Sequence, residues 1–411
     1  MASAVPSLRD GHQIQLLQGG REYFAALIEA MDQARSEVRL ETYIFDFTAS
    51  GAEVAEALIR AARRGVTTWL VVDGVGTGAL AEPWQRRFDE AGVQWRVYSP
   101  LGALGLLIPS RWRRLHRKLC AIDGRVAFCG GINILDDFHD PQYGVLQAPR
   151  FDFAVRAAGA LVQEVQETTA QLWWRMQAVR NVRQHNFPEA FSSFRAGGLH
   201  LPWTGADAHA GHDERLVARA GLLLRDNLRH RGQIEKAYRK AIGSAREEII
   251  IANAYFVPGR KLRQALIHAA QRGVRVRQLL QGKYEYFMQY HAARPVYGVL
   301  LAAGVEIHEY EASFLHAKVA VIDANADRPW ATVGSSNLDP LSLLLAREAN
   351  VVVADGPFAI GLRERLVHAI RHGSRRVNPD QYASRPLRQR LLDRMAFGLM
   401  RLALFVTGNR Y

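Results

Sequence analysis

The sequence is poor in cysteine and has no long uninterrupted apolar stretch. Its 411 residues include two cysteines, Cys120 and Cys129, whose spacing fits neither a zinc motif nor a redox couple. We therefore expect two small apolar side chains buried in a hairpin, and a reducing compartment. No segment reaches the roughly 20 uncharged apolar residues that span a bilayer. The N-terminus lacks a basic segment followed by an apolar one, so we expect no signal peptide and a protein that stays on the cytoplasmic side.

Acidic residues are outnumbered by basic ones. The 53 lysines and arginines against 40 acidic residues give a formal charge of +13. This excess favours a polyanionic partner, either nucleic acid or an anionic membrane surface, and composition alone does not choose between them. The hydrophobic content of 48% and charged content of 23% are ordinary for a folded soluble protein, which argues against disorder of the whole chain.

The chain contains an internal repeat. Residues 34–45 (ARSEVRLETYIF) resemble residues 245–256 (AREEIIIANAYF), and the helical patterns of residues 53–66 and 261–274 both end in Gly-Val. In both copies strands alternate with helices, as in α/β folds. The repeat predicts two pseudo-symmetric halves, each a mixed or mostly parallel sheet flanked by helices, that share one active site. We place the halves at residues 10–195 and 215–375, with a linker at 196–214 and a tail at 376–411.

One short motif occurs once in each half. Residues 115–123 read LHRKLCAID and residues 315–323 read LHAKVAVID, and they place three polar residues at the same offsets: His116, Lys118, Asp123 and His316, Lys318, Asp323. Because residues i and i+2 of a strand point to the same face, each histidine should project together with its lysine. Two isolated core histidines would not explain a motif repeated inside a repeat.

The residues after each motif predict a hairpin. Asp-Gly at 123–124 is typical of a tight turn, after which the return strand should bring Gly130 and Gly131 opposite His116, with Asn133 beside it. Such glycines leave room for a substrate group, and the amide is a hydrogen-bond donor. The second half repeats the pattern, after a longer turn, with Gly334, Ser335 and Asn337.

Each half also has a carboxylate that could orient an imidazole. Asp152 and Glu348 each begin a β-branched strand, and we expect Asp152 to hold His116 and Glu348 to hold His316, within their own halves. A carboxylate partner fixes the tautomer of an imidazole and raises its basicity.

Two histidines, two lysines and two asparagines in one pocket suit a phosphodiester. One imidazole can attack phosphorus while the other protonates the departing alcohol. Lysines, amides and backbone N–H groups can stabilise the charged oxygens, so neither a metal nor another cofactor is required. Acidic and histidine residues in the loop at 135–150 leave a metal site as an alternative to a solvated loop: Asp136, Asp137, His139 and Asp140. Residues 71–80 (VVDGVGTGAL) lack the full dinucleotide-binding glycine pattern and are expected to form a plain loop.

The stretch HRKLCAIDGRVAFCGGIN resembles the phospholipase D superfamily, whose signature is H-x-K-x4-D-x6-G-x2-N, and the second copy matches apart from its longer spacer. The resemblance implies a phosphohistidine intermediate, with His116 as nucleophile and His316 as general acid/base, although the sequence itself does not decide that order. It implies phosphate contacts from a set of residues in both halves: Lys118, Lys318, Asn133, Asn337, Gly131 and Ser335. Asp123 and Asp323 belong to the signature, and their position at turns predicts a structural role.

Further stretches, among them ETYIFDF, IIIANAYFVPG and GSSNLDPLSL, look like the bacterial cardiolipin synthases of the shorter type without N-terminal transmembrane helices. The resemblance covers nearly all of residues 12–375. It implies transfer of a phosphatidyl group to the hydroxyl of phosphatidylglycerol, from a second phosphatidylglycerol or from phosphatidylethanolamine. A hydrolase of the same superfamily, with water as acceptor, is one alternative. A nuclease is another, which the charge permits but the scarcity of aromatics suited to base stacking disfavours, so no nucleic-acid partner is expected.

The tail at residues 385–411 predicts an amphipathic helix. Apolar residues share one broad face of it: Leu387, Leu391, Met395, Leu399, Leu402 and Val406. We expect this helix to lie on an anionic membrane surface, at the cytoplasmic side of the inner membrane, with a helix packed on the core as the alternative. A second candidate membrane contact is the stretch at 100–118, where an apolar loop is followed by three arginines, with ordinary core as its alternative.

Overall fold

The computed structural model describes residues 7–102, 109–140, 143–196, 218–226, 230, 232–283, 287–339 and 346–406. The predicted linker at 196–214 lies, except for its first residue, outside the described residues. The apolar part of the candidate membrane loop, at 103–108, also lies outside them.

One mixed sheet runs through the molecule, and each half contributes an equivalent set of strands. The first half supplies β1 (Arg9–Gln18), β2 (Glu37–Thr42), β3 (Thr67–Asp73), β4 (Gln94–Tyr98), β6 (Lys118–Ile122), β7 (Val126–Gly130) and β10 (Phe153–Gly159). The second supplies β11 (Ala218–Arg225), β12 (Glu248–Asn253), β13 (Arg275–Gln281), β14 (Glu306–Tyr310), β15 (Lys318–Ile322), β16 (Trp330–Gly334), β17 (Ala346–Ala354) and β18 (Ser374–Arg376). The order β4-β3-β2-β6-β7-β10-β1 in one half matches β14-β13-β12-β15-β16-β17-β11 in the other. The repeat seen in the sequence is therefore a repeat of strand order.

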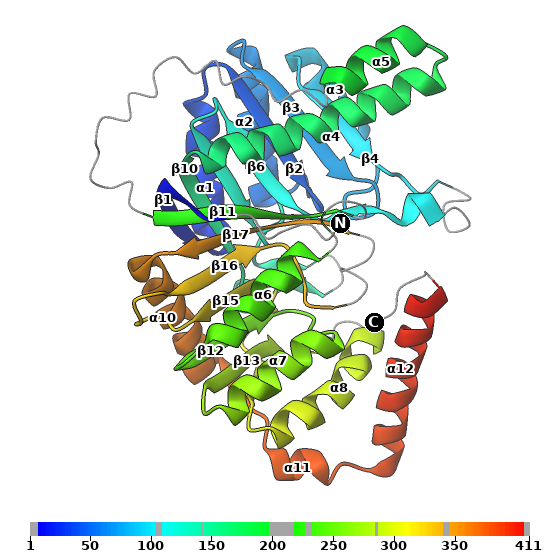
Figure 1. The fold of residues 1–411 in the computed structure, drawn as a ribbon. Coiled ribbons are helices and arrows are strands. Elements are labelled where there is room, and N and C mark those ends of the chain that lie inside the picture. Colours follow the sequence, from blue (N-terminus) through cyan, green and yellow to red (C-terminus); the bar gives the residue numbers. More distant parts are fainter. Residues whose placement is uncertain are drawn as a thin grey trace.

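The sheet is less parallel than the alternation of strands and helices alone suggests. Along the sheet, β2–β3–β4 and β12–β13–β14 pair in parallel, as does the short strand β5 (Arg114–Leu115) with β17. The other neighbouring strands pair antiparallel. The two halves join through β1 and β11, and β7 and β10 lie against β16 and β17. This arrangement brings the central strands of the two halves together (Figure 1).

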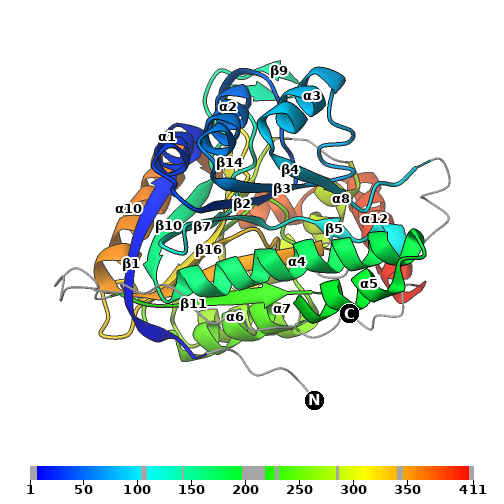
Figure 2. The same cartoon turned by 90° about the horizontal axis from the view of Figure 1, so that it is seen from above.

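Helices cover the outer faces of the sheet. The first half is covered by α1 (Gly19–Asp32), α2 (Ala49–Arg63) and α3 (Glu82–Ala91), and the second by α6 (Gln233–Ser244), α7 (Arg260–Gln271) and α8 (Phe287–Ala302). A third core, shared by both halves, packs under α4 (Leu161–Arg183) and α10 (Gly356–Gly373). The remaining helices are α5 (Phe187–Ala196), α11 (Pro379–Ala383) and α12 (Leu387–Val406). In Figure 2 the long helix α4 crosses in front of this central region.

Local chemistry explains where several elements end. The glycines of the predicted Gly-Val pairs, Gly65 and Gly273, have φ of 86° and 89°, a backbone conformation that favours glycine, so both helices end as predicted. Cys120 and Cys129 lie buried and free on the neighbouring strands β6 and β7, which confirms the prediction of a buried hairpin.

The tail forms α12, which packs along α8 (Figure 1). Asp393 and Ala396 are buried on its packed face. Four apolar side chains spaced four residues apart are exposed on another face: Leu387, Leu391, Met395 and Leu399. The side chains of Leu402 and Val406, the other predicted members of that face, are outside the described set. Within the described part of the chain, no helix combines the length and the apolar character needed to cross a membrane.

Candidate active site

The two motif histidines are each held by a carboxylate of the opposite half. Nδ1 of His116 lies 3.0 Å from Oε1 of Glu348, and Nδ1 of His316 lies 2.6 Å from Oδ2 of Asp152. The prediction that each carboxylate serves its own half was therefore wrong in its pairing, although both carboxylates contact an imidazole. A carboxylate can only accept a hydrogen bond, so each ring carries its hydrogen on Nδ1. Nε2 of each ring is therefore left with a lone pair.

Backbone hydrogen bonds across the two halves produce this exchange. The amide of His116 donates to the carbonyl of Arg347 at 3.1 Å, and the amide of His316 donates to the carbonyl of Phe151 at 3.0 Å. Arg347 directly precedes Glu348, and Phe151 directly precedes Asp152. Each motif thus runs beside the start of a strand of the other half, and that strand's first carboxylate reaches the ring.

A second pair of equivalent residues binds the backbone amide of the residue just before each histidine. The carboxylate of Asp73, at the end of β3, accepts the amide of Leu115 at 2.7 Å. The side-chain oxygen of Gln281, at the end of β13, accepts the amide of Leu315 at 3.1 Å. Residues 71–80 were predicted to form a plain loop, but residues 71–73 end β3, and the role of Asp73 was not predicted. The signal was the alignment of TTWLVVDG with RVRQLLQG, which sets Asp73 against Gln281.

The first half of the site has two further residues that lie outside the motif pattern. The ring of Tyr43 lies 4.9 Å from the imidazole of His116, measured between centroids, and 5.4 Å from Nζ of Lys118. Arg114 forms an ion pair with Asp73 at 3.1 Å. Both make the surroundings of His116 different from those of His316.

The two motif lysines are buried next to their histidines. Nζ of Lys118 donates to the carbonyl oxygen of His116 at 2.8 Å, and Lys318 donates to the carbonyl of His316 in the same way. Burial, together with the charge of Lys318, lowers the pKa of Lys118 to about 7. The two ammonium groups are therefore close enough to repel each other, and an anionic group between them would stabilise both charges.

The imidazoles and their carboxylates are not equivalent. Burial lowers the pKa of His116, and burial together with the two lysines lowers the pKa of His316 further. Burial raises the pKa of Asp152 to about 6. Burial alone would also raise the pKa of Glu348, but His116, Lys118 and a hydrogen bond from Ser335 hold it below its usual value. At neutral pH both rings are therefore neutral in the empty site, and Glu348 is firmly an anion.

The remaining predicted contacts lie around these pairs. Ser335 donates its hydroxyl to Glu348, and a Cβ added to Gly131 would meet Oδ1 of Asp152 at 2.3 Å. Asn133 accepts the amide of Ile44 at 3.2 Å, while Oδ1 of Asn337 is buried without a hydrogen-bond partner in the described part of the chain. Gly131 thus leaves room for the carboxylate of Asp152, and Ser335 holds the carboxylate of Glu348. That Gly131 and Ser335 contact phosphate stays a prediction.

The hairpin register differs from the predicted one by one residue. Gly130 pairs with Lys118 rather than with His116, because the turn at 123–125 is one residue longer than a two-residue loop centred on Asp-Gly. Asp123 has φ of 52° and accepts the amides of Arg35, Ser36 and Glu37 at 2.8–2.9 Å. These amides hold the pKa of Asp123 below its usual value although its burial opposes them.

Asp323 plays the same part in the second half, where it accepts the amides of Arg246, Glu247 and Glu248. Both signature aspartates therefore tie a turn to the start of a neighbouring strand.

The acidic loop is held together by contacts of its own. Asp136 accepts the hydroxyl of Ser50 at 2.7 Å, Asp137 accepts the amide of Gly20, and Asp140 pairs with Arg150 at 2.6 Å. Among the residues that the structure describes, no three acidic, histidine or cysteine side chains are grouped to hold a metal ion.

A two-fold repeat that brings two carboxylate-held imidazoles and two buried lysines together defines a phospholipase D-like protein. A family model described as "Cardiolipin synthase, PLD-like domain" matches residues 27–143 and 238–368. The chain therefore belongs to the cardiolipin synthase family of PLD-like proteins.

Individual relatives agree with this assignment. Cardiolipin synthase B of Escherichia coli K12 is 37% identical over 371 residues, which are 88% of this chain and 81% of that one. Cardiolipin synthase B of Salmonella typhi is 37% identical over 92% of this chain and 85% of its own. The crystal structure of phosphatidylserine synthase from Haemophilus influenzae Rd KW20 has the same fold, with a TM-score of 0.65 over 97% of this chain and 96% of that one, at 11% identity.

Proposed function

We propose that this phosphatidyltransferase makes cardiolipin by moving a phosphatidyl group, through a phosphohistidine, onto the hydroxyl of phosphatidylglycerol. The observation that carries the proposal is the crossed pairing of His116 with Glu348 and of His316 with Asp152. It presents two neutral imidazoles, each with a free Nε2 lone pair, beside two lysines that an anionic phosphate would stabilise. Membership of the cardiolipin synthase family supplies the substrate class.

The proposed reaction has two steps. As the anionic donor lipid binds, His316 takes up a proton from solvent on Nε2, because the phosphate stabilises the imidazolium. Nε2 of His116 then attacks phosphorus, the P–O bond to the headgroup alcohol breaks, and His316 gives that alcohol its proton and becomes neutral again. His316 then removes the proton from a hydroxyl of phosphatidylglycerol, whose oxygen attacks phosphorus and breaks the P–N bond. With phosphatidylglycerol as donor the products are cardiolipin and glycerol; with phosphatidylethanolamine the released alcohol is ethanolamine.

The other site residues have supporting roles in this proposal. Lys118, Lys318, Asn133 and Asn337 bind the phosphate oxygens, assisted by Gly131 and Ser335, while Asp123 and Asp323 maintain the turns. We also propose residues 10–195 and 215–375 as the two halves, 196–214 as their linker and 376–411 as the membrane-binding tail. The proposed chemistry uses no metal or other cofactor and no nucleic acid.

We assign the nucleophile to His116 from the family resemblance, and the reverse order has an observation in its favour. The pKa of His316 is lowered further, so that ring is the more fully neutral one at rest, and only a neutral ring can attack phosphorus. Phosphohistidine is not stable in acid, so the enzyme should be exposed briefly to labelled lipid and then quenched in alkali. Mass spectrometry then identifies the labelled residue. Label on His116 supports our order, and label on His316 reverses it.

We further propose peripheral binding to the cytoplasmic side of the inner membrane through α12. Its exposed stripe of Leu387, Leu391, Met395 and Leu399 can enter the headgroup region while arginines of the same helix meet anionic lipids. Figures 1 and 2 both place α12 on the side of the molecule where the segment leading into β5 (Arg114–Leu115) lies. That segment continues directly into His116.

The test uses purified protein, anionic vesicles and labelled phosphatidylglycerol, with and without phosphatidylethanolamine, and resolves the lipids by chromatography. Cardiolipin that forms with intact protein and is lost in His116→Ala and His316→Ala supports the transferase. Dependence on phosphatidylethanolamine would identify the donor. Phosphatidic acid as the sole product would show a hydrolase, and cleavage of single-stranded DNA without lipid products would show a nuclease.

A further inference from the structure

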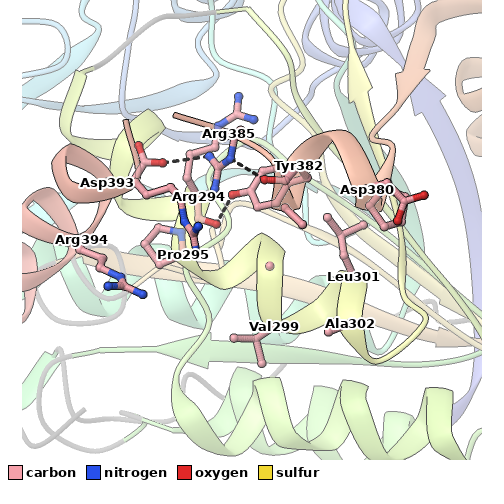
Figure 3. A pocket seen from close by; sticks show the side chains of 14 residues that line it. Arg294, Pro295, Val299, Leu301, Ala302, Asp380, Tyr382, Arg385, Asp393 and Arg394 are labelled. Atoms are coloured by element: carbon pink, nitrogen blue, oxygen red, sulfur yellow. Dashed lines mark hydrogen bonds and ion pairs between the residues drawn. The ribbon is translucent and has the colours of Figure 1, made fainter. Parts of the chain in front are cut away.

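A pocket of about 480 Å³ lies between α8, α11 and α12, and it contains none of the motif residues (Figure 3). Its floor is apolar, because α8 contributes Pro295, Gly298, Val299 and Ala302. Arginines from α8, from α12 and from the residues that precede α12 contribute to the rest of the lining: Arg294, Arg385, Arg390 and Arg394. The combination of an apolar floor and a cationic rim suits a ligand that is both apolar and anionic.

Two of these arginines already have partners. Arg294 forms an ion pair with Glu309 at 2.9 Å, and Arg385 forms one with Asp393 at 2.9 Å. Asp393 also contacts His291 at 2.8 Å, so its charge is shared within this buried cluster. The contact between Asp393 and His291 ties α12 to α8, and the two ion pairs neutralise Arg294 and Arg385.

The other two arginines are not neutralised. Arg390 and Arg394 lie one helical turn apart on α12, both are exposed, and neither forms an ion pair within the described part of the chain. With Arg294 and Arg385 paired, the two free arginines face one further lining carboxylate, Asp380, which leaves a net charge of +1. The pocket therefore attracts an anion at the edge that Arg390 and Arg394 line.

The position of these arginines around α12 identifies the kind of anion. The buried face of the helix holds Asp393 and Ala396, and the exposed apolar stripe holds Leu391 and Met395. At 3.6 residues per turn, Arg394 lies between these two faces, and Arg390 lies on the same line one turn earlier. A phosphate at the arginines would thus have apolar side chains next to it on the outer surface, as the phosphate of a bilayer lipid has.

We infer that this pocket binds the phosphate of an anionic phospholipid in the bilayer, at a site separate from the two histidines. The inference rests on the proposed membrane-associated function and adds a defined headgroup site to it. Arginine pairs form directed hydrogen bonds with phosphate, in addition to diffuse attraction. The apolar floor on α8 accepts the start of an acyl chain, and the stripe on α12 accompanies the rest of the acyl chains.

Two single substitutions on α12 separate a headgroup site from diffuse attraction. Arg394→Ala and Arg388→Ala each remove one positive charge from an exposed position of the same helix, and Arg388 does not line the pocket. Binding of the full chain to phosphatidylcholine vesicles, with and without phosphatidylglycerol, should be measured by sedimentation. We expect Arg388→Ala to weaken binding about fivefold, as one interfacial charge does, and Arg394→Ala to weaken it roughly 30-fold or more. Equal losses would overturn the proposal.

A second measurement locates the ligand. Hydrogen exchange of residues 295–302 should slow when soluble short-chain phosphatidylglycerol is added to the wild-type protein, and should not respond in Arg394→Ala. Unchanged exchange in the wild-type protein contradicts the site, and equal slowing by inorganic phosphate alone would show an anion site rather than a lipid site. Melting temperatures of both variants check that they fold.

These outcomes are independent of catalysis. A protein that makes no cardiolipin but shows the difference between Arg394→Ala and Arg388→Ala would refute the proposed function and support the pocket. A protein that makes cardiolipin with equal losses in the two variants would do the reverse.

Discussion

Lys118 is the side chain of the site whose charge depends most on pH near neutrality. Burial and the charge of Lys318 lower its pKa to about 7, so the empty enzyme loses this charge as the pH rises through that value. We expect kcat/KM for a soluble short-chain lipid to fall above about pH 7, approaching tenfold per pH unit. A bound phosphate stabilises the ammonium, so the corresponding fall in kcat should lie at higher pH.

The matched variant for this prediction is Lys118→Arg. Arginine stays charged throughout this range, so the alkaline fall should disappear even though the altered geometry lowers the absolute rate. A kcat/KM that stays level up to pH 9 in the wild-type enzyme, or an unchanged alkaline fall in the variant, would show that another group is responsible. At the acid end, activity should decline below about pH 6, where Asp152 gains a proton and no longer accepts from His316.

At the scale of the element, the hairpin of β6 and β7 depends on a glycine that faces a carboxylate. A Cβ at Gly131 would meet Oδ1 of Asp152 at 2.3 Å, so Gly131→Ala must move the carboxylate away from His316. We expect cardiolipin formation to fall roughly 100-fold and the free energy of unfolding to fall by about 1–3 kcal/mol. Rate assays and denaturant titrations measure both.

Gly243→Ala is the control for that variant. Gly243 lies in α6 with no atom within 4 Å of an added Cβ. Alanine there should stabilise the helix by up to about 1 kcal/mol and leave activity intact. If Gly131→Ala kept full activity, the crossed contact between Asp152 and His316 would not matter for the reaction.

A further prediction at the scale of the element concerns the exposed apolar stripe on α12. Leu391 and Met395 are exposed, so replacing both by aspartate should not lower the melting temperature. Loss of two buried apolar side chains at the bilayer should weaken vesicle binding by roughly 100-fold. Phe191→Asp, on the exposed surface of α5, serves as the control and should bind vesicles normally. Normal binding by the α12 variant would show that another surface meets the membrane.

At the scale of the whole molecule, both imidazoles and both carboxylates of the site come from one chain. Each histidine is completed by the other half of the same polypeptide, so a chain without His116 cannot be repaired by a chain without His316. We expect a mixture of His116→Ala and His316→Ala proteins to form no more cardiolipin than either alone. Recovery of activity on mixing, or on unfolding and refolding them together, would indicate that halves exchange between chains.

The motif residues, to which the proposed chemistry is assigned, could be predicted from the sequence because they form a local pattern. His116, Lys118 and Asp123 fall within nine residues, and their repetition in the second half reveals a duplicated strand and turn. The periodic apolar positions and the Gly-Val helix ends likewise indicate the order of strands and helices. These features depend on neighbours along the chain, which the sequence displays directly.

The sequence by itself thus determined the two motifs, the repeat and the residues for which we propose the chemistry. The tertiary structure alone decided that Glu348 holds His116, that Asp152 holds His316, and that Asp73 and Gln281 support the preceding amides. It also decided that Arg390 and Arg394 border a pocket on α8. The physical reason is that all of these contacts join segments distant in the chain, and their geometry exists only after the halves pack through β1 and β11.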